Sequence, residues 1–178
     1  MKKIIIVLCA VLLFTGCSCS LNDNKPEEAV TTFFEKYRNK DVDIIKQLKD
    51  TIDNEFMTDE AKVKYQELME KQYNQFAYVI KDVKENNDTA TATVELTVLN
   101  FRDAVLNAED ELKAHPEKFT NENGKFSEEK YAKYKMKLME DVKDTVVHTI
   151  EVSLTKDAGI WRVDQLSSDD ISKLHGLY

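Results

Sequence analysis

Glycine, histidine and cysteine are scarce in this sequence, and their placement excludes several classes of enzyme. The 178 residues include four glycines, three histidines and three cysteines. Each glycine is isolated, so neither the dinucleotide-binding fingerprint nor the phosphate-binding Walker loop can be written at any position. No histidine opens an HExxH helix, and no serine stands in a GxSxG sequence. The sequence therefore predicts no catalytic residue, metal site or cofactor.

Positive charge is also in short supply. The chain has 25 Lys+Arg against 33 Asp+Glu, a formal net charge of -8, and no cluster of basic residues. Because proteins hold the phosphates of nucleic acids with clustered lysine and arginine, we expect no nucleic-acid partner. With 42% hydrophobic and 33% charged residues, the chain has enough apolar side chains to fold as one ordinary domain.

The first residues have the pattern of an export signal. Two lysines precede eleven apolar residues at 4–14, and this run is shorter than the roughly 20 residues that a membrane-spanning helix needs. The segment that follows, Leu13-Phe14-Thr15-Gly16-Cys17, resembles the lipobox of bacterial lipoproteins. In those proteins the cysteine thiol receives a diacylglyceryl group and the signal is cut just before it. The resemblance implies cleavage after Gly16 and lipidation of Cys17.

This expectation divides the chain into a signal peptide at 1–16, a lipidated cysteine with a polar tether at 17–25, and a single domain at 26–178. The domain contains no cysteine, so it cannot form an internal disulfide. Cys19 is an unpaired thiol, a second acylation site or an intermolecular bridge. The Lys, Asn and Ile content suggests a low-GC Gram-positive bacterium. The expected location is the extracytoplasmic face of the cell membrane, with the membrane itself as a partner through the lipid anchor.

The spacing of apolar residues predicts an α+β domain. Helical spacing recurs before residue 76, and an alternation with period two then marks strands, most clearly over 89–98. A helical insertion over 101–144 separates two predicted β-hairpins, and Ser168 is expected to cap a short last helix. The predicted helices, hairpins and insertion follow in the order 26–37, 44–52, 61–73, 76–98, 101–144 and 146–164.

The hairpin registers follow from the lengths assigned to the turns. Four-residue turns at 85–88 and 156–159 bring apolar positions together across the strands. The expected cross-strand partners are Val79 with Val94 and Leu154 with Trp161.

The order of these elements resembles the NTF2-like (cystatin-like) lipoproteins of Gram-positive bacteria. The segment from Pro26 to Phe34 is similar to the opening helix of that group, and the segment from Gly159 to Asp164 is similar to its final strand. The resemblance implies N-terminal helices packed on a curved antiparallel sheet that forms a cone. The insertion at 101–144 departs from the compact pattern. The resemblance implies no specific activity, so no functional residue is carried over from the family.

Three residues are candidates to line a pocket if the concave side of such a sheet holds one. His148 stands on an otherwise apolar strand face, where it is either a buried core histidine or a base or ligand-binding group. Tyr78 and Trp161 are the aromatic candidates beside it. The favoured interpretation is a non-enzymatic domain that binds a protein, peptide or small-molecule ligand. The alternative is an enzyme with a cone-shaped pocket around His148.

Overall fold

In the described part of the chain, three helices precede the first strand, as the apolar spacing predicts. The computed structural model describes residues 24–54 and 58–178, so the expected signal peptide and Cys17 lie outside the described residues. Helix α1 begins at a proline, which the first helical turn tolerates, and Glu27 and Glu28 complement its N-terminus. The three helices are α1 (Pro26–Arg38), α2 (Val42–Asp53) and α3 (Asp59–Gln75).

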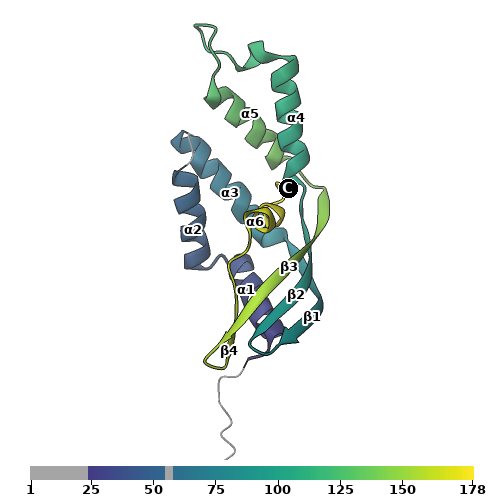
Figure 1. Cartoon of the computed structure of the whole chain (residues 1–178). Helices are drawn as coiled ribbons and strands as arrows, with labels where there is room; N and C mark the ends of the chain where they lie inside the picture. The colour runs from purple at the N-terminus through teal and green to yellow at the C-terminus, as the bar shows by residue number, and fades with distance from the viewer. Residues whose placement is uncertain (1–23, 55–57) are drawn as a thin grey trace, which may run out of the picture.

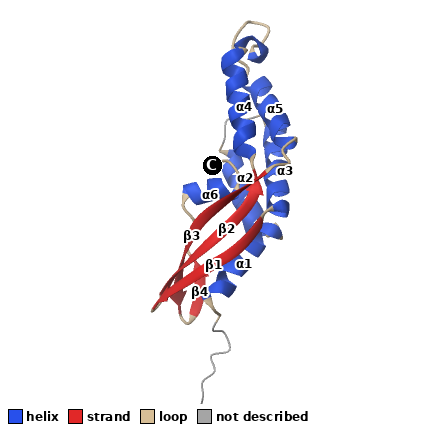
Figure 2. Ribbon diagram, turned by 90° about the vertical axis from the view of Figure 1, so that its right-hand side faces the viewer, coloured by secondary structure: helices blue, strands red, loops and turns tan. Residues whose placement is uncertain are grey.

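The four strands form one antiparallel sheet in the order β1-β2-β3-β4, and the sheet does not close into a barrel. Their bounds are β1 (Ala77–Asn86), β2 (Thr89–Leu99), β3 (Thr145–Asp157) and β4 (Ile160–Val163). Alanine, valine and leucine of β2 point to the buried face, and its threonines point outward. Helix α1 packs on β1, β2 and β4, while no helix of the described residues covers the opposite face of the sheet (Figure 2). The α+β class is therefore confirmed.

The predicted helical insertion is confirmed and extends the molecule in one direction. It comprises α4 (Phe101–Ala114), the short 3-10 helix η1 (Pro116–Phe119) and α5 (Glu128–Glu140), between β2 and β3. Helices α4 and α5 stand as a hairpin at one end of the molecule, and the turn between β3 and β4 lies near the other end (Figure 1). The last helix, α6 (Ser168–Leu174), begins after Ser167, whose hydroxyl caps it in place of the expected Ser168.

The predicted register of the first hairpin is wrong. Its turn has two residues, because Asn86 pairs with Thr89, and a β-bulge follows between Ile80 and Asp82. Ile80 consequently lies opposite Val94, on the buried face. Val79 instead lies opposite Glu95 and is 55% exposed on the open face.

The second hairpin is also closed by a two-residue turn, so its predicted register is wrong by two positions. Asp157 pairs with Ile160, and the two turn residues, Ala158 and Gly159, both have positive φ (49° and 86°). A tight hairpin turn of this kind needs that conformation, which glycine adopts without strain. Leu154 therefore lies opposite Val163, and Trp161 lies opposite Lys156. Leu154 and Trp161 still share the buried face because a shift of two preserves the face.

The core lies between the helices and the covered face of the sheet. Side chains from α1 and α3 meet the apolar residues of β2 and β3 there, and the ring of Phe34 lies 4.9 Å from that of Tyr78. Fully buried members include Val30, Phe34, Met69, Val94 and Val152.

Candidate functional site

A cleft with a volume of about 640 Å³ separates the first half of α3 from α5. The two helices come from segments about 70 residues apart in the chain, and Lys64 of α3 contacts Glu140 at the end of α5. Residues of α3 and of its cap form one wall, and one face of α5 forms the other. The lining consists of Thr58, Glu60, Ala61, Lys64, Glu129, Lys133, Met136, Lys137 and Glu140.

Local sequence accounts for both walls. The hydroxyl of Thr58 accepts a hydrogen bond from the backbone N–H of Ala61 (3.3 Å), which starts α3 at the mouth of the cleft. On α5 the lining residues recur three and four positions apart, so they lie on one helix face. Ala61 and Met136 are buried and form an apolar floor, with charged side chains on the rim.

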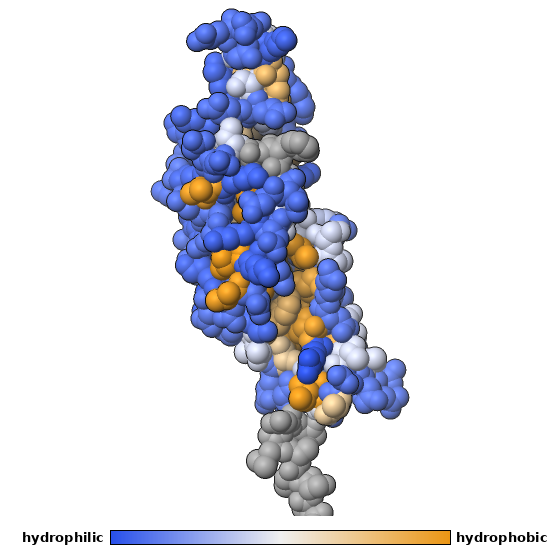
Figure 3. Space-filling model, turned by 90° about the vertical axis from the view of Figure 1, so that its left-hand side faces the viewer, coloured by the Kyte–Doolittle hydropathy of each residue, from blue (hydrophilic) through white to orange (hydrophobic). Residues whose placement is uncertain are grey.

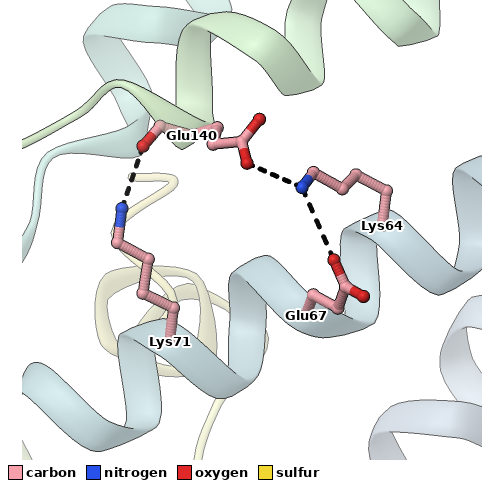
Figure 4. Close-up of polar contacts among 4 residues, drawn as sticks. All are labelled: Lys64, Glu67, Lys71 and Glu140. Carbon is pink, nitrogen blue, oxygen red and sulfur yellow. Dashed lines mark hydrogen bonds and ion pairs between the residues drawn. The ribbon is translucent and has the colours of Figure 1, made fainter.

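Charged and polar contacts join the two helices where Glu140 lines the cleft (Figure 4). Lys64 donates to the Glu140 carboxylate at 2.8 Å and also faces Glu67 at 3.5 Å. Lys71 donates to the backbone carbonyl of Glu140 (2.9 Å), at the C-terminus of α5, where the helix dipole favours a cation. These contacts fix the C-terminal end of α5 against α3.

The rim carries equal numbers of acidic and basic side chains, but only some of them are paired. The hydrogen bond with Lys64 lowers the pKa of Glu140 and raises the pKa of Lys64. Among the residues that the structure describes, Glu129, Lys133 and Lys137 on the α5 rim and Glu60 on the α3 rim form no ion pair. The cleft thus offers an apolar floor between an α5 rim with two unpaired lysines and one unpaired glutamate and an α3 rim with one unpaired glutamate.

The surface around the distal hairpin is mainly hydrophilic. Seen from the side on which α2 lies, blue residues cover the upper part of the molecule, and apolar residues gather in the middle and lower parts (Figure 3). Helix α5 exposes lysines and glutamates, while Met136 and Met139 are buried. The apolar floor of the cleft is therefore recessed behind charged side chains.

The three residues predicted to line a pocket do not come together, and none of them lines this cleft. Tyr78 and His148 lie on either side of Leu96, about 10 Å apart at the usual strand spacing. Trp161 pairs with Lys156, and Lys156 lies eight residues further along β3 than His148. At the usual rise per residue of a strand, Trp161 is therefore about 26 Å from His148. The Tyr78 hydroxyl donates to Glu35 (3.2 Å), and burial together with this bond raises the pKa of Tyr78.

His148 lies on the helix-covered face of β3, near the C-terminus. Its ring centroid is 6.0 Å from that of Tyr178, in an edge-to-face arrangement. The Nε2 atom is buried and has no hydrogen-bond partner among the described residues. Burial, and secondarily the positive charge of Lys173, lower the pKa of His148. The ring is consequently neutral near pH 7.

Trp161 is buried on the edge strand β4, and its backbone is bound by a residue expected in the tether. The Asn24 side chain accepts from the Trp161 N–H (2.8 Å) and donates to the Trp161 carbonyl (3.1 Å). The start of the described chain is thereby fixed to the end of the sheet where the β3–β4 turn lies (Figure 1).

Sequence reasoning missed a buried polar cluster where α3, β2 and the C-terminal segment meet. The Gln72 amide is fully buried and exchanges two hydrogen bonds with the backbone of Leu99 (2.9 and 3.2 Å). The Tyr73 hydroxyl lies 2.9 Å from Nε2 of His175. Burial lowers the pKa of His175 to about 4 and raises that of Tyr73, so both groups are neutral near pH 7, and the histidine tautomer decides which of them donates.

The sequence carries a weak signal for this cluster. Gly176 has a φ of +70°, and a Cβ there would lie 2.0 Å from the Leu99 carbonyl oxygen. A lone glycine after a helix with a histidine in its last turn is typical of a helix C-cap, but it does not reveal what the backbone approaches.

Comparison with known proteins gives no relative: no protein-family model, curated protein or solved structure matches this chain. Within residues 24–54 and 58–178, no helix has the length and apolar character needed to cross a bilayer. In the same residues, no group of three or more His, Cys, Asp or Glu side chains is placed to hold a metal ion.

Proposed function

We propose that this protein is a lipoprotein, anchored through Cys17 at the extracytoplasmic face of the cell membrane, whose domain binds a polypeptide partner in the cleft between α3 and α5. The observation that carries the binding function is the cleft itself, an apolar floor of Ala61 and Met136 between charged helical rims. The anchor is supported by the lipobox-like segment that ends at Cys17.

The chemistry of the cleft favours an amphipathic helix over a small charged ligand. A helix lying between α3 and α5 would place its apolar stripe on Ala61 and Met136. Acidic residues on one flank would meet Lys133 and Lys137, and basic residues on the other would meet Glu60. A small anion or cation would instead need charges of one sign converging on a point, whereas the rim alternates in sign.

The position of Asn24 supports a role for the distal end. Asn24 stands seven positions after Cys17, which corresponds to about 25 Å of extended chain, so the Asn24 end of the sheet would lie close to the membrane. The α4–α5 hairpin stands at the opposite end (Figure 1). An anchored molecule would therefore present the cleft away from the bilayer, where a partner can reach it.

The NTF2-like (cystatin-like) cone remains our proposal for the fold family. Helices on one face of a twisted antiparallel sheet, with α1 packed across it, support it. The enzyme alternative would place chemistry at His148. Within the described part of the chain, Nε2 of this ring has no hydrogen-bond partner, and the charge that acts on its pKa is that of Lys173, so no described carboxylate orients the ring as a base. The geometry thus favours the binding role.

The anchor is tested by replacing the lipidated cysteine. Cys17→Ala in the full chain should block lipidation and abolish partitioning into the detergent phase, whereas Cys19→Ala should leave partitioning unchanged. Equal partitioning of wild type and Cys17→Ala would refute the anchor.

The cleft is tested with a synthetic helical peptide that carries leucines on one face, glutamates on one flank and lysines on the other. The double variant Lys133→Glu/Lys137→Glu should bind this peptide about tenfold more weakly, since both rims are then acidic. The matched control, Lys46→Glu/Lys49→Glu, makes the same charge change on exposed positions of α2 and should bind like wild type. Equal binding by all three proteins, or no binding by wild type, would refute the cleft as the site.

A further inference from the structure

Over about half of its length, the outer edge of β3 has no partner strand within residues 24–54 and 58–178. Strand β4 ends at Val163, and the last bond of that pair runs from the Asp164 N–H to the Ser153 carbonyl (2.9 Å). On the other side of β3, the backbone N–H of Lys156 donates to the carbonyl oxygen of Asp88, just before β2 (2.7 Å). The backbone N–H and C=O groups of the even-numbered residues of β3 therefore point toward β2, and those of the odd-numbered residues point away from it. The N–H and C=O groups that point outward beyond β4 belong to Thr145, Val147, Thr149 and Glu151.

This edge is open among the residues that the structure describes. Strand β3 packs mainly against β2 and β4, and no described strand or turn bonds to the four outward residues. All four are exposed, Val147 by 59%. The free stretch of seven residues is about 23 Å long, enough for eight main-chain hydrogen bonds to an antiparallel strand.

The opposite edge of the sheet is protected in ways that the β3 edge is not. Proteins blunt exposed edges with bulges and charged residues, and β1 has both: a bulge at Lys81 and ion pairs from Lys81 to Glu95 and from Lys84 to Asp82. The outward residues of β3 have a continuous register, three β-branched side chains and one charge. Such a strand readily accepts another strand.

We propose that the edge of β3 from Thr145 to Glu151 binds an extended polypeptide segment of a partner protein by β-augmentation. Only a peptide backbone offers donors and acceptors in the alternation that this edge requires. Side chains of the added strand that point to the helix-covered face would lie beside His148 and Tyr178, whose ring is 56% exposed, so the residue opposite His148 is apolar. The site is distinct from the cleft between α3 and α5.

A second copy of this chain is a poorer occupant. All strands of this sheet pair antiparallel. The β3 edges of two copies can pair in the same way only if a two-fold axis perpendicular to the sheet relates the copies. That rotation points the two Asn24 ends in opposite directions, because the strands run along the molecule (Figure 2). Two anchored copies in one membrane cannot adopt this arrangement, a step that rests on the lipid anchor proposed above.

The test uses a capped, labelled peptide with the sequence of residues 145–153, which can pair antiparallel with β3 without opposing like charges. It is titrated with the full chain in detergent micelles. Val147→Pro removes one outward N–H without touching the bonds to β2 and should weaken binding about tenfold. Val147→Thr keeps the N–H and should bind like wild type.

Hydrogen exchange provides the second measurement and does not depend on a variant that folds. The peptide should slow exchange of the Val147 and Thr149 amides in the wild-type chain and leave the β1 edge unchanged. Unchanged exchange at these two amides, or equal affinity of a folded Val147→Pro, would overturn the proposal. So would a dimer of the wild-type chain that protects the same amides without peptide. Peptide binding by a Cys17→Ala chain that still partitions into detergent like wild type would support the edge while refuting the anchor.

Discussion

Replacing Gly176 by alanine should destabilise the fold by several kcal/mol, because two separate penalties fall on one site. The backbone of Gly176 has a φ of +70°, a left-handed conformation that costs a residue with a Cβ about 1–2 kcal/mol. The added Cβ would lie 2.0 Å from the Leu99 carbonyl oxygen and 2.6 Å from Nε2 of Gln72. It would therefore break the buried hydrogen bond between these two groups and leave both without a partner, which costs about 1–3 kcal/mol of stability.

The two penalties together predict a loss of about 2–5 kcal/mol in the free energy of unfolding, measured by urea titration. Gly124→Ala is the matched control: its φ is +72°, and a Cβ there would meet nothing within 4 Å. This control carries only the conformational penalty of about 1–2 kcal/mol. If the two variants lose the same stability, the close approach of Gly176 to the amide of Gln72 does not contribute, and the reasoning fails.

Two histidines give further predictions. His148→Leu should leave the free energy of unfolding unchanged or raise it by up to about 1 kcal/mol, because the buried Nε2 has no described hydrogen-bond partner to lose. His148→Ala should lower the free energy of unfolding by about 1–3 kcal/mol, because the smaller side chain leaves a cavity. Thermal unfolding ranks the three proteins, and a loss in both variants would mean that the ring has a partner in solution. The pKa of His175 is about 4 in the folded chain and 6.5 when the ring is exposed. The neutral ring therefore makes its full contribution to the free energy of unfolding above pH 6.5, and this contribution is lost as the pH falls toward 4. Urea unfolding at pH 7 and pH 4.5 should show a loss of about 2–3 kcal/mol that His175→Gln reduces; an equal loss in the variant would assign the pH dependence to other groups.

The sequence predicted the elements of this fold well and their pairing poorly. Threonine alternates with alanine or valine along β2 because one face of the strand is buried, and this pattern is local. The registers depended on turn length, and polar tetrapeptides such as 85–88 are compatible with turns of two or four residues. The bulge left a trace, since the half-buried residues Tyr78, Ile80 and Val83 are spaced by two and then by three.

The candidate site could not be predicted because its walls are brought together only by the fold. Lys64, Lys133 and Glu140 have the spacing of solvated helix faces, and the sequence contains nothing to indicate that α3 and α5 would face one another. His148 attracted attention because it interrupts an apolar strand face. Its neighbours, however, are set by α6 and the C-terminus, which lie more than 20 residues away along the chain.

The buried cluster around Gln72 links the core to the proposed cleft. Helix α3 begins at the mouth of the cleft and carries Gln72 in its last turn, while α4, which leads into α5, begins two residues after Leu99. The Gly176 carbonyl accepts from the Arg102 N–H (2.8 Å) in the first turn of α4. The angle between α3 and the α4–α5 hairpin is therefore fixed where Gln72, Leu99 and Gly176 meet, and that angle sets the width of the cleft. A substitution at Gly176 should consequently weaken binding of the helical peptide even under conditions in which the chain remains folded.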